Sequence, residues 1–193
     1  MGGGERLPHG SFSRFRQGDA LTSRQQGFTL IELLIVVAII GIIAAIAIPS
    51  LLRARVSANE AATVGDIRTV ISAEGAYHGA NSGEYGELTC LATPSNAACI
   101  PGYSPAAPTF LDPNLGSVTL VKSGYVRSAN YLGPGGQAAD WNSYCYGASP
   151  VTLNRTGTRS FGGDASASLG GGFGTLACCV AGSLAAVCPA LAN

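Results

Sequence analysis

One uninterrupted apolar segment constrains this chain more than any other feature. Residues 28–48 read FTLIELLIVVAIIGIIAAIAI and carry a single charge, on Glu32. As a helix, these 21 residues would span about 30 Å, the hydrocarbon thickness of a bilayer. A secretory signal has a shorter apolar region followed by a small-x-small cleavage site, which residues 49–53 do not offer. A buried core helix is disfavoured because every face is apolar, so the segment predicts a membrane-spanning helix.

The residues on either side extend this interpretation. Residues 1–27 are polar, rich in Gly and Ser, and lack hydrophobic periodicity, so they indicate a leader rather than a domain. After the apolar segment, residues 53–80 are rich in Ala and contain no turn signal until residues 78–83. Pro49 is expected to kink the helix rather than end it, because strong helix formers follow. We therefore expect one helix of roughly fifty residues, with residues 28–52 in the membrane and residues 53–80 amphipathic.

The amphipathic part has apolar residues at mostly helical spacing. Its apolar side chains are those of Val56, Val64, Ile67, Val70, Ile71 and Tyr77. The polar residues expected on its other faces are Arg55, Asn59, Glu60, Asp66, Arg68 and Glu74. This spacing predicts that the apolar stripe packs on the remainder of the chain.

Residues 81–193 predict a loop followed by a small antiparallel sheet, so the fold class is α+β. Five prolines between residues 84 and 117 indicate an irregular loop. Segments rich in Val, Tyr and Thr predict strands at residues 117–120, 124–132, 143–152 and 158–161, with a return near 165–169. The aromatic side chains of this region and of Tyr77 are expected to build the helix–sheet core. The uncharged tail favours a disulfide-tied segment packed on the sheet over a second membrane span.

Composition argues against several functional classes. The 11 basic and 11 acidic residues cancel, so no basic surface for nucleic acid is expected. The two histidines and the lack of a G-x-S-x-G motif leave little for catalysis, so we expect no enzyme and no cofactor. No metal site is expected either, because there is no C-x-x-C motif. The carboxylates of Asp112, Asp140 and Asp164 are isolated in sequence and are expected to be solvated, with a calcium site as the alternative.

The six cysteines all follow the apolar segment, on the proposed external side, where disulfides persist. Cys90 and Cys99 flank a short loop containing proline and are natural partners. The other four, Cys145, Cys178, Cys179 and Cys188, allow three connectivities, and the sequence does not choose between them. The adjacent Cys178 and Cys179 are expected to bond elsewhere rather than to each other.

The junction Gln26-Gly27-Phe28-Thr29-Leu30-Ile31-Glu32, with the apolar run that continues to Pro49, resembles the class III leader junction of type IV prepilins and pseudopilins. The resemblance extends from residue 26 to about residue 80. It implies cleavage by prepilin peptidase between Gly27 and Phe28, which removes residues 1–27 as a leader, and N-methylation of Phe28. Gly27 would let the backbone approach the peptidase without a side chain.

Glu32 is the most informative single residue, because a carboxylate in a membrane helix costs a few kcal/mol. One interpretation is that Glu32 lies near enough to the interface to snorkel. The other, implied by the resemblance, is that it pairs with the Phe28 amine of a neighbouring subunit. Cleavage creates that amine, so processing would switch assembly on.

The expected function is therefore that of a structural subunit of a type IV pilus, a homopolymeric fibre. The partners implied by the resemblance are prepilin peptidase, the pilus or type II secretion assembly platform, and the inner membrane before assembly. The leader would be cytoplasmic and the product an extracellular fibre or a periplasmic pseudopilus. The alternatives are a type II secretion pseudopilin or a minor pilin and, more remotely, a membrane-anchored periplasmic enzyme.

Overall fold

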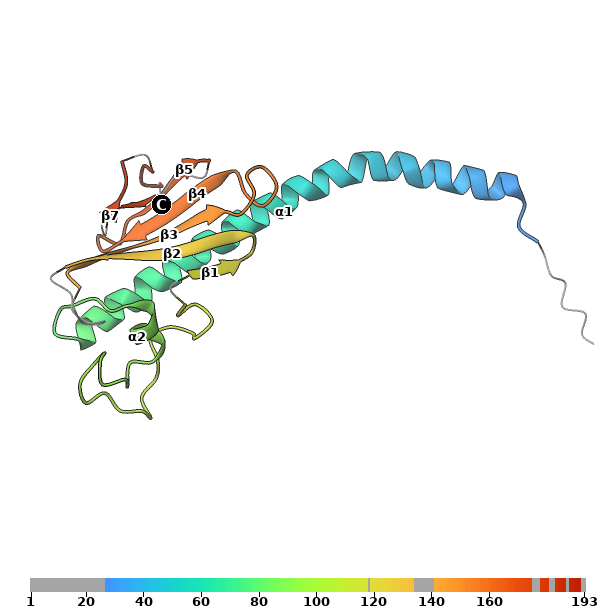
Figure 1. Ribbon diagram of the computed structural model, residues 1–193. Coiled ribbons are helices and arrows are strands. Elements are labelled where there is room, and N and C mark those ends of the chain that lie inside the picture. Colours follow the sequence, from blue (N-terminus) through green and yellow to red (C-terminus); the bar gives the residue numbers. More distant parts are fainter. Residues whose placement is uncertain are drawn as a thin grey trace, which may run out of the picture. The chain divides into compact units, whose positions relative to one another are not determined.

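The computed structural model describes residues 27–117, 119–133, 141–174, 178–180, 183–186 and 188–191. It has the expected α+β architecture, with a 51-residue helix α1, Leu30–Ala80, and a five-stranded antiparallel sheet (Figure 1). The chain divides into two compact units at Ile42 and Ile43. The described part of the first unit is residues 27–42, and the second unit holds the sheet and the packed part of α1. The prediction of one helix of about fifty residues is confirmed.

The sheet has the strand order β1-β2-β3-β4-β5, and every neighbouring pair is antiparallel. Its strands are β1 Thr119–Lys122, β2 Tyr125–Leu132, β3 Ser143–Pro150, β4 Arg159–Asp164 and β5 Leu169–Phe173. The last strand differs most from the sequence prediction, which placed a return at residues 165–169. Residues 165–168 instead form the turn, and β5 continues through Gly170, Gly171 and Gly172. Three consecutive glycines argue against a strand by propensity, but pairing with β4 overrides that preference.

Part of α1 packs on one face of the sheet within the second unit, and its buried residues are not those of the expected stripe alone. Ile67, Val70 and Tyr77 are buried as expected. Glu60 and Glu74, which were expected on other faces, are buried as well. The expectation for these two carboxylates was wrong because each has polar contacts within the fold, which the periodicity of apolar residues does not register.

Glu60 is held by the start of β4. Its Oε1 accepts hydrogen bonds from the backbone N–H and the hydroxyl of Thr158 at 2.8 and 2.7 Å, and its Oε2 pairs with Arg159 at 2.7 Å. Burial would raise the pKa of this carboxyl, but these hydrogen bonds and the Arg159 charge outweigh it and lower the pKa. Glu60 is therefore an ionised, satisfied link between helix and sheet.

Glu74 lies in the opposite kind of environment, 14 residues further along the helix. It is fully buried, and the one hydrogen bond it accepts from the backbone is from Gly86 N–H at 3.4 Å. Burial raises the pKa of Glu74 well above its usual range, and the Gly86 contact only partly opposes this. The carboxyl of Glu74 is therefore harder to ionise in the folded chain than in water.

A charge network joins the middle of α1 to β1 and β2. Asp66 pairs with Arg127 at 2.7 Å and with Lys122 at 2.9 Å. The Arg127 side chain is completely buried, whereas that of Lys122 is 46% exposed. Asp66 thus neutralises a guanidinium that has no access to water.

The other face of the sheet is covered by the end of the chain. The short strands β6, Cys179–Val180, and β7, Ser183–Leu184, pair with each other and contact β3 and β4. Three glycines lie in one cross-strand row, because Gly147 pairs with Gly162 and Gly162 pairs with Gly170. A Cβ at Gly162 would lie 2.9 Å from the Cβ of Cys178, so this row gives the terminal segment room to lie flat on the sheet.

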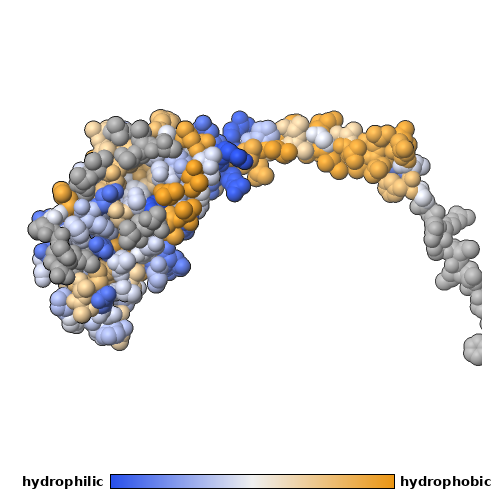
Figure 2. All heavy atoms as spheres, viewed as in Figure 1, coloured by the Kyte–Doolittle hydropathy of each residue, from blue (hydrophilic) through white to orange (hydrophobic). Residues whose placement is uncertain are grey.

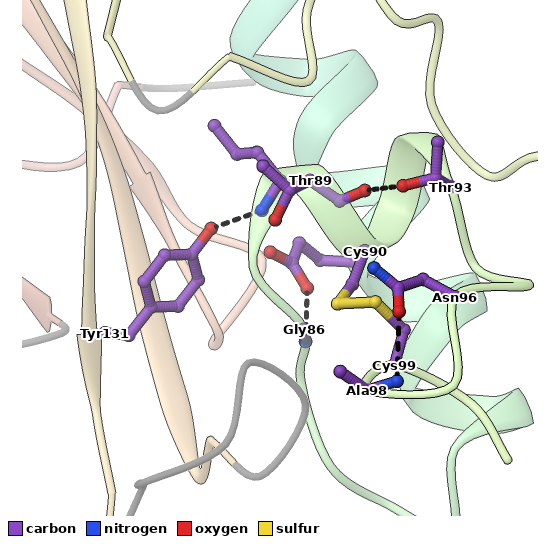
Figure 3. Close-up of a disulfide and its surroundings, with 10 residues drawn as sticks. Gly86, Thr89, Cys90, Thr93, Asn96, Ala98, Cys99 and Tyr131 are labelled. Carbon is purple, nitrogen blue, oxygen red and sulfur yellow. Dashed lines mark hydrogen bonds between the residues drawn. A yellow bond between two sulfur atoms is a disulfide. The ribbon is translucent and has the colours of Figure 1, made fainter.

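The loop after α1 contains one regular element that the sequence analysis did not anticipate, the helix α2, Leu88–Ala92. Leu88 and Leu91 are fully buried in the core. The hydroxyl of Tyr131 in β2 accepts a hydrogen bond from the Leu88 N–H at 2.9 Å, and Cys90 is bonded to Cys99 beside it (Figure 3). The five prolines of this segment predicted an irregular loop and gave no signal for a one-turn helix. The helix forms because this packing stabilises it, not because of the helix propensity of its residues.

Candidate assembly site

The junction between residues 27 and 28 is accessible. Gly27 to Thr29 lie outside regular structure, and α1 begins at Leu30. Gly27 is exposed, a Cβ built on it would meet no atom within 4 Å, and Phe28 is 79% exposed. Residues 1–26, which include Gln26 and most of the expected leader, lie outside the described residues. The described side of the junction is therefore exposed and outside regular structure.

Glu32 makes a reciprocal pair of hydrogen bonds with Thr29. The Thr29 Oγ1 accepts a hydrogen bond from the Glu32 N–H at 3.2 Å. The Glu32 Oε2 accepts from the Thr29 N–H at 2.9 Å and from the Thr29 hydroxyl at 2.6 Å. This is the capping-box arrangement, in which Thr and a Glu three residues later satisfy each other's backbone donors at a helix start.

Thr29 is the residue of this candidate site that the sequence analysis missed. Its signal was available, since Thr-x-x-Glu directly before an apolar run is the sequence pattern of a capping box. The consequence for Glu32 is geometric. The hydrogen bonds to Thr29 hold the Glu32 carboxylate at the N-terminus of α1, one residue away from Phe28. The helix dipole favours a negative charge at this end.

Apolar side chains cover the helix that follows. From Leu30 to Leu52 the Leu, Ile and Val side chains are exposed, with values between 45% for Val36 and 76% for Leu30. Figure 2 shows this hydrophobic stretch along the first part of α1. The helix is long and apolar enough to cross a membrane, and it is the only such helix among the described residues. A surface of this kind is normally covered by lipid or by other copies of the helix.

Pro49 lies inside α1, which continues through it without interruption. Proline removes one backbone donor and crowds the preceding turn. The expected kink at this position stays a prediction.

The cysteines of the described chain all form disulfides. Besides Cys90–Cys99, the structure contains Cys145–Cys179 and Cys178–Cys188, and no described cysteine is free. Cys178 and Cys179 thus bond to different partners. The Cys145–Cys179 bond links the terminal segment to β3, and the Cys178–Cys188 bond closes a loop within that segment. The loop and the tail are therefore each covalently closed.

The candidate calcium ligands are not brought together. Asp164 was expected to be solvated but is buried. Its carboxylate accepts hydrogen bonds from the N–H groups of Ser166 at 3.0 Å and of Leu184 at 3.1 Å, and these replace water. Asp112 accepts from the Asn114 N–H at 2.8 Å within its own turn, and Asp140 lies outside the described residues. No group of three potential metal ligands occurs in the part of the chain that the structure describes.

Comparison with known proteins places the similarity in this same region. A family model for the prokaryotic N-terminal methylation motif matches residues 22–48. The fimbrial protein of Moraxella nonliquefaciens is 44% identical over 93 residues, covering 38% of this chain and 59% of the relative. The type IV major fimbrial protein of Dichelobacter nodosus is 56% identical over 55 residues, covering 26% and 35%.

A third relative, the major component of the type IV wide pilus of Thermus thermophilus, is 48% identical over 52 residues, covering 27% of this chain and 40% of the relative. The chain thus spans between about a third and three fifths of the length of these relatives. No solved structure matches it significantly. The resemblance to the type IV pilin family, predicted from the residues around Gly27, is confirmed, and these three relatives are named as fimbrial or pilus proteins.

Proposed function

We propose that this chain is a structural subunit of a type IV pilus. The single observation that supports this most is the start of α1. There the Glu32 carboxylate caps a helix whose apolar surface is exposed, next to an accessible Gly-Phe junction. A fibre of packed helices would bury this surface, which the chain itself leaves uncovered. The similarity to pilus proteins in the same residues supports the proposal.

In this proposal the chain has four functional parts. Residues 1–27 are a cytoplasmic leader, residues 28–52 the membrane and fibre-core segment, residues 53–80 the packed helix, and residues 81–193 the external loop, sheet and tail. Prepilin peptidase cleaves after Gly27, Phe28 is methylated on its new amine, and the assembly platform extracts the subunit from the inner membrane into the fibre.

Glu32 sets the register of assembly in this proposal. Cleavage leaves a charged amine on Phe28, next to the residue that caps the helix together with Glu32. In a staggered array of helices, the Glu32 carboxylate of one subunit pairs with the Phe28 amine of another, which removes two charges from hydrocarbon. Hydrophobic packing of residues 28–52 supplies the bulk of the contact area.

The mature N-terminus provides the test. Mass spectrometry of the fibre or membrane form should show a chain that starts at methylated Phe28, and Gly27→Arg should leave the leader attached. Gly65→Arg is the matched control, because Gly65 is also exposed with open space around it but lies far from the junction. A mature chain that begins at any other residue would contradict the proposal.

A pseudopilin of a secretion system shares the same junction and would give the same N-terminus. The two are separated by where the assembled protein accumulates. Fibres sheared from the cell surface support the pilus, whereas polymer confined to the periplasm supports the pseudopilus.

A further inference from the structure

A pocket of about 630 Å³ opens where the apolar part of α1 ends. One wall consists of α1 residues from Leu52 to Glu60, and the other of the loop between β3 and β4, residues 152–158. All of these residues belong to the second unit. The volume lies within the usual range of small-molecule sites.

The pocket is positively charged. Arg53 and Arg55 from the helix and Arg155 from the loop line it, and all three are exposed. None of the three forms an ion pair with a described residue. The one carboxylate in the lining, that of Glu60, is already engaged by Thr158 and by Arg159. The three guanidinium groups are therefore available to an anion, and guanidinium binds phosphate oxygens in a bidentate manner.

The loop that carries Arg155 is fastened to the helix. The Asn59 side chain donates a hydrogen bond to the Thr156 carbonyl at 3.0 Å, and the Asn154 N–H donates to the Gly157 carbonyl at 2.8 Å. The Thr156 hydroxyl accepts from the Thr152 N–H at 3.1 Å. Arg155 is thus held on a closed turn opposite Arg53 and Arg55 rather than on a loose segment.

The place of the pocket along the helix indicates the source of the phosphate. Arg53 follows the end of the apolar run at residue 48 by five residues, about 7–8 Å of helix. If residues 28–48 span the bilayer, as in the proposed function on which this step rests, the pocket lies at headgroup depth. Leu52 and Val56 line it beside the arginines, so it offers an apolar surface for the glycerol and upper acyl chains.

We propose that this pocket binds the phosphodiester headgroup of an anionic glycerophospholipid while the subunit resides in the membrane before assembly. Arg53, Arg55 and Arg155 contact the phosphate, and Leu52 and Val56 contact the apolar part of the lipid. The proposal also explains why Arg53 and Arg55 follow the apolar segment, on the side where the positive-inside rule disfavours basic residues. They bind lipid rather than set orientation.

The experiment uses the full chain in nanodiscs of phosphatidylcholine containing one tenth phosphatidylglycerol. Native mass spectrometry of the ejected protein measures how often each lipid is retained. The ratio of retained phosphatidylglycerol to retained phosphatidylcholine should exceed their ratio in the bilayer at least tenfold. Arg53→Gln, Arg55→Gln and Arg155→Gln should each lower the enrichment about fivefold, the effect of one basic residue near an anionic surface, and the triple variant should abolish it.

Arg68→Gln is the matched control, since Arg68 is also an exposed arginine of α1 but lies outside this pocket, and it should leave the enrichment unchanged. Alkylation of each unreduced variant should leave its cysteines unlabelled, which checks that the variant is folded with its disulfides formed. Retained enrichment in the triple variant, or retention of the two lipids in their bilayer ratio by the wild-type chain, would overturn the proposal. Displacement of the lipid by millimolar inorganic phosphate would show a free-anion site and overturn the lipid assignment.

Three further outcomes are distinguished. Loss of chemical cross-linking between copies in the triple variant, with lipid retention unchanged, would assign the arginines to a contact between subunits and overturn the proposal. Carbonate extraction of the wild-type chain from native membranes would instead contradict membrane insertion, and with it the proposed function. An inserted chain without lipid enrichment contradicts the headgroup site alone.

Discussion

The two parts of α1 reverse the usual distribution of residues. From Leu30 to Leu52 the helix exposes its Leu, Ile and Val side chains, whereas from residue 60 to residue 77 it buries Glu60, Thr63 and Glu74 beside Ile67 and Val70. Exposed apolar surface costs free energy until something covers it, so the first part indicates an interface to be completed by lipid or other subunits. Glu60 is stabilised by Thr158 and Arg159, and Glu74 is accommodated with a raised pKa and one backbone contact from Gly86, so the second part packs within the chain. One helix thus combines a part whose apolar side chains are exposed with a part that packs on the sheet.

The largest effect should come from the first part. Glu32→Val should insert into the membrane but yield almost no sheared fibre, because every added subunit would bury an unpaired Phe28 amine. Stranding one member of a buried ion pair costs about 3–5 kcal/mol. The measurement is fibre yield against membrane-bound monomer.

Glu32→Gln sharpens this test, because glutamine keeps the capping-box acceptor and removes only the charge. Thr29→Val is the converse control, since it removes a cap worth about 1 kcal/mol and keeps the carboxylate. We expect Glu32→Gln to fail like Glu32→Val and Thr29→Val to assemble. Normal fibres from Glu32→Gln would reduce Glu32 to a capping residue.

In the second part, Asp66→Asn should destabilise the folded chain by about 3–5 kcal/mol, because the fully buried guanidinium of Arg127 would lose its counter-charge. Lys122→Gln removes the exposed partner of the same carboxylate and should cost less than about 1 kcal/mol. Urea denaturation of the full chain in detergent measures both. Equal costs would show that burial does not separate the two ion pairs.

A smaller loss should follow from opening the loop next to this helix. The double variant Cys90→Ser with Cys99→Ser should lower the free energy of unfolding by about 2–3 kcal/mol, the loop-entropy value for so short a closure. Peptide mapping after alkylation of the unreduced wild-type chain should find both thiols unlabelled. Labelling at both positions would contradict the bond and the external location of this loop.

The last predicted effect is a gain in stability. Glu74→Gln should stabilise the chain by roughly 1–2 kcal/mol at pH 7, because burial raises the pKa of this carboxyl in the folded state, whereas the unfolded state ionises it freely. A raised pKa means that stability is greatest below the unfolded pKa of about 4.3 and falls as pH rises. The difference between variant and wild type should therefore vanish near pH 4. A constant difference across pH 4–7 would show that Glu74 does not titrate in this range.

Local patterns predicted the architecture well, and non-local contacts account for what they missed. The apolar run and the alanine-rich continuation were enough to predict α1, and the β-branched and aromatic runs were enough to place four strands within a few residues. The burial of Glu60 and Glu74 was missed because their partners lie about 98 and 12 residues away in sequence. The pairing of Cys145, Cys178, Cys179 and Cys188 was likewise undetermined, since it depends on how the tail crosses the sheet.

The adjacent cysteines at the end of the chain have a consequence for biogenesis. Exchanging their partners would join Cys178 to Cys145 and Cys179 to Cys188, a shift of one residue that turns the β6 side chains to the opposite face. Cys178 and Cys179 pack closely on Gly162 in the native arrangement, but the two cysteines are adjacent in sequence, so both pairings are open to a reduced chain. A chain that has oxidised to the exchanged pairing can therefore reach the native one only by thiol–disulfide exchange. A strain that lacks disulfide isomerase activity should accumulate fully oxidised subunits that never enter a fibre.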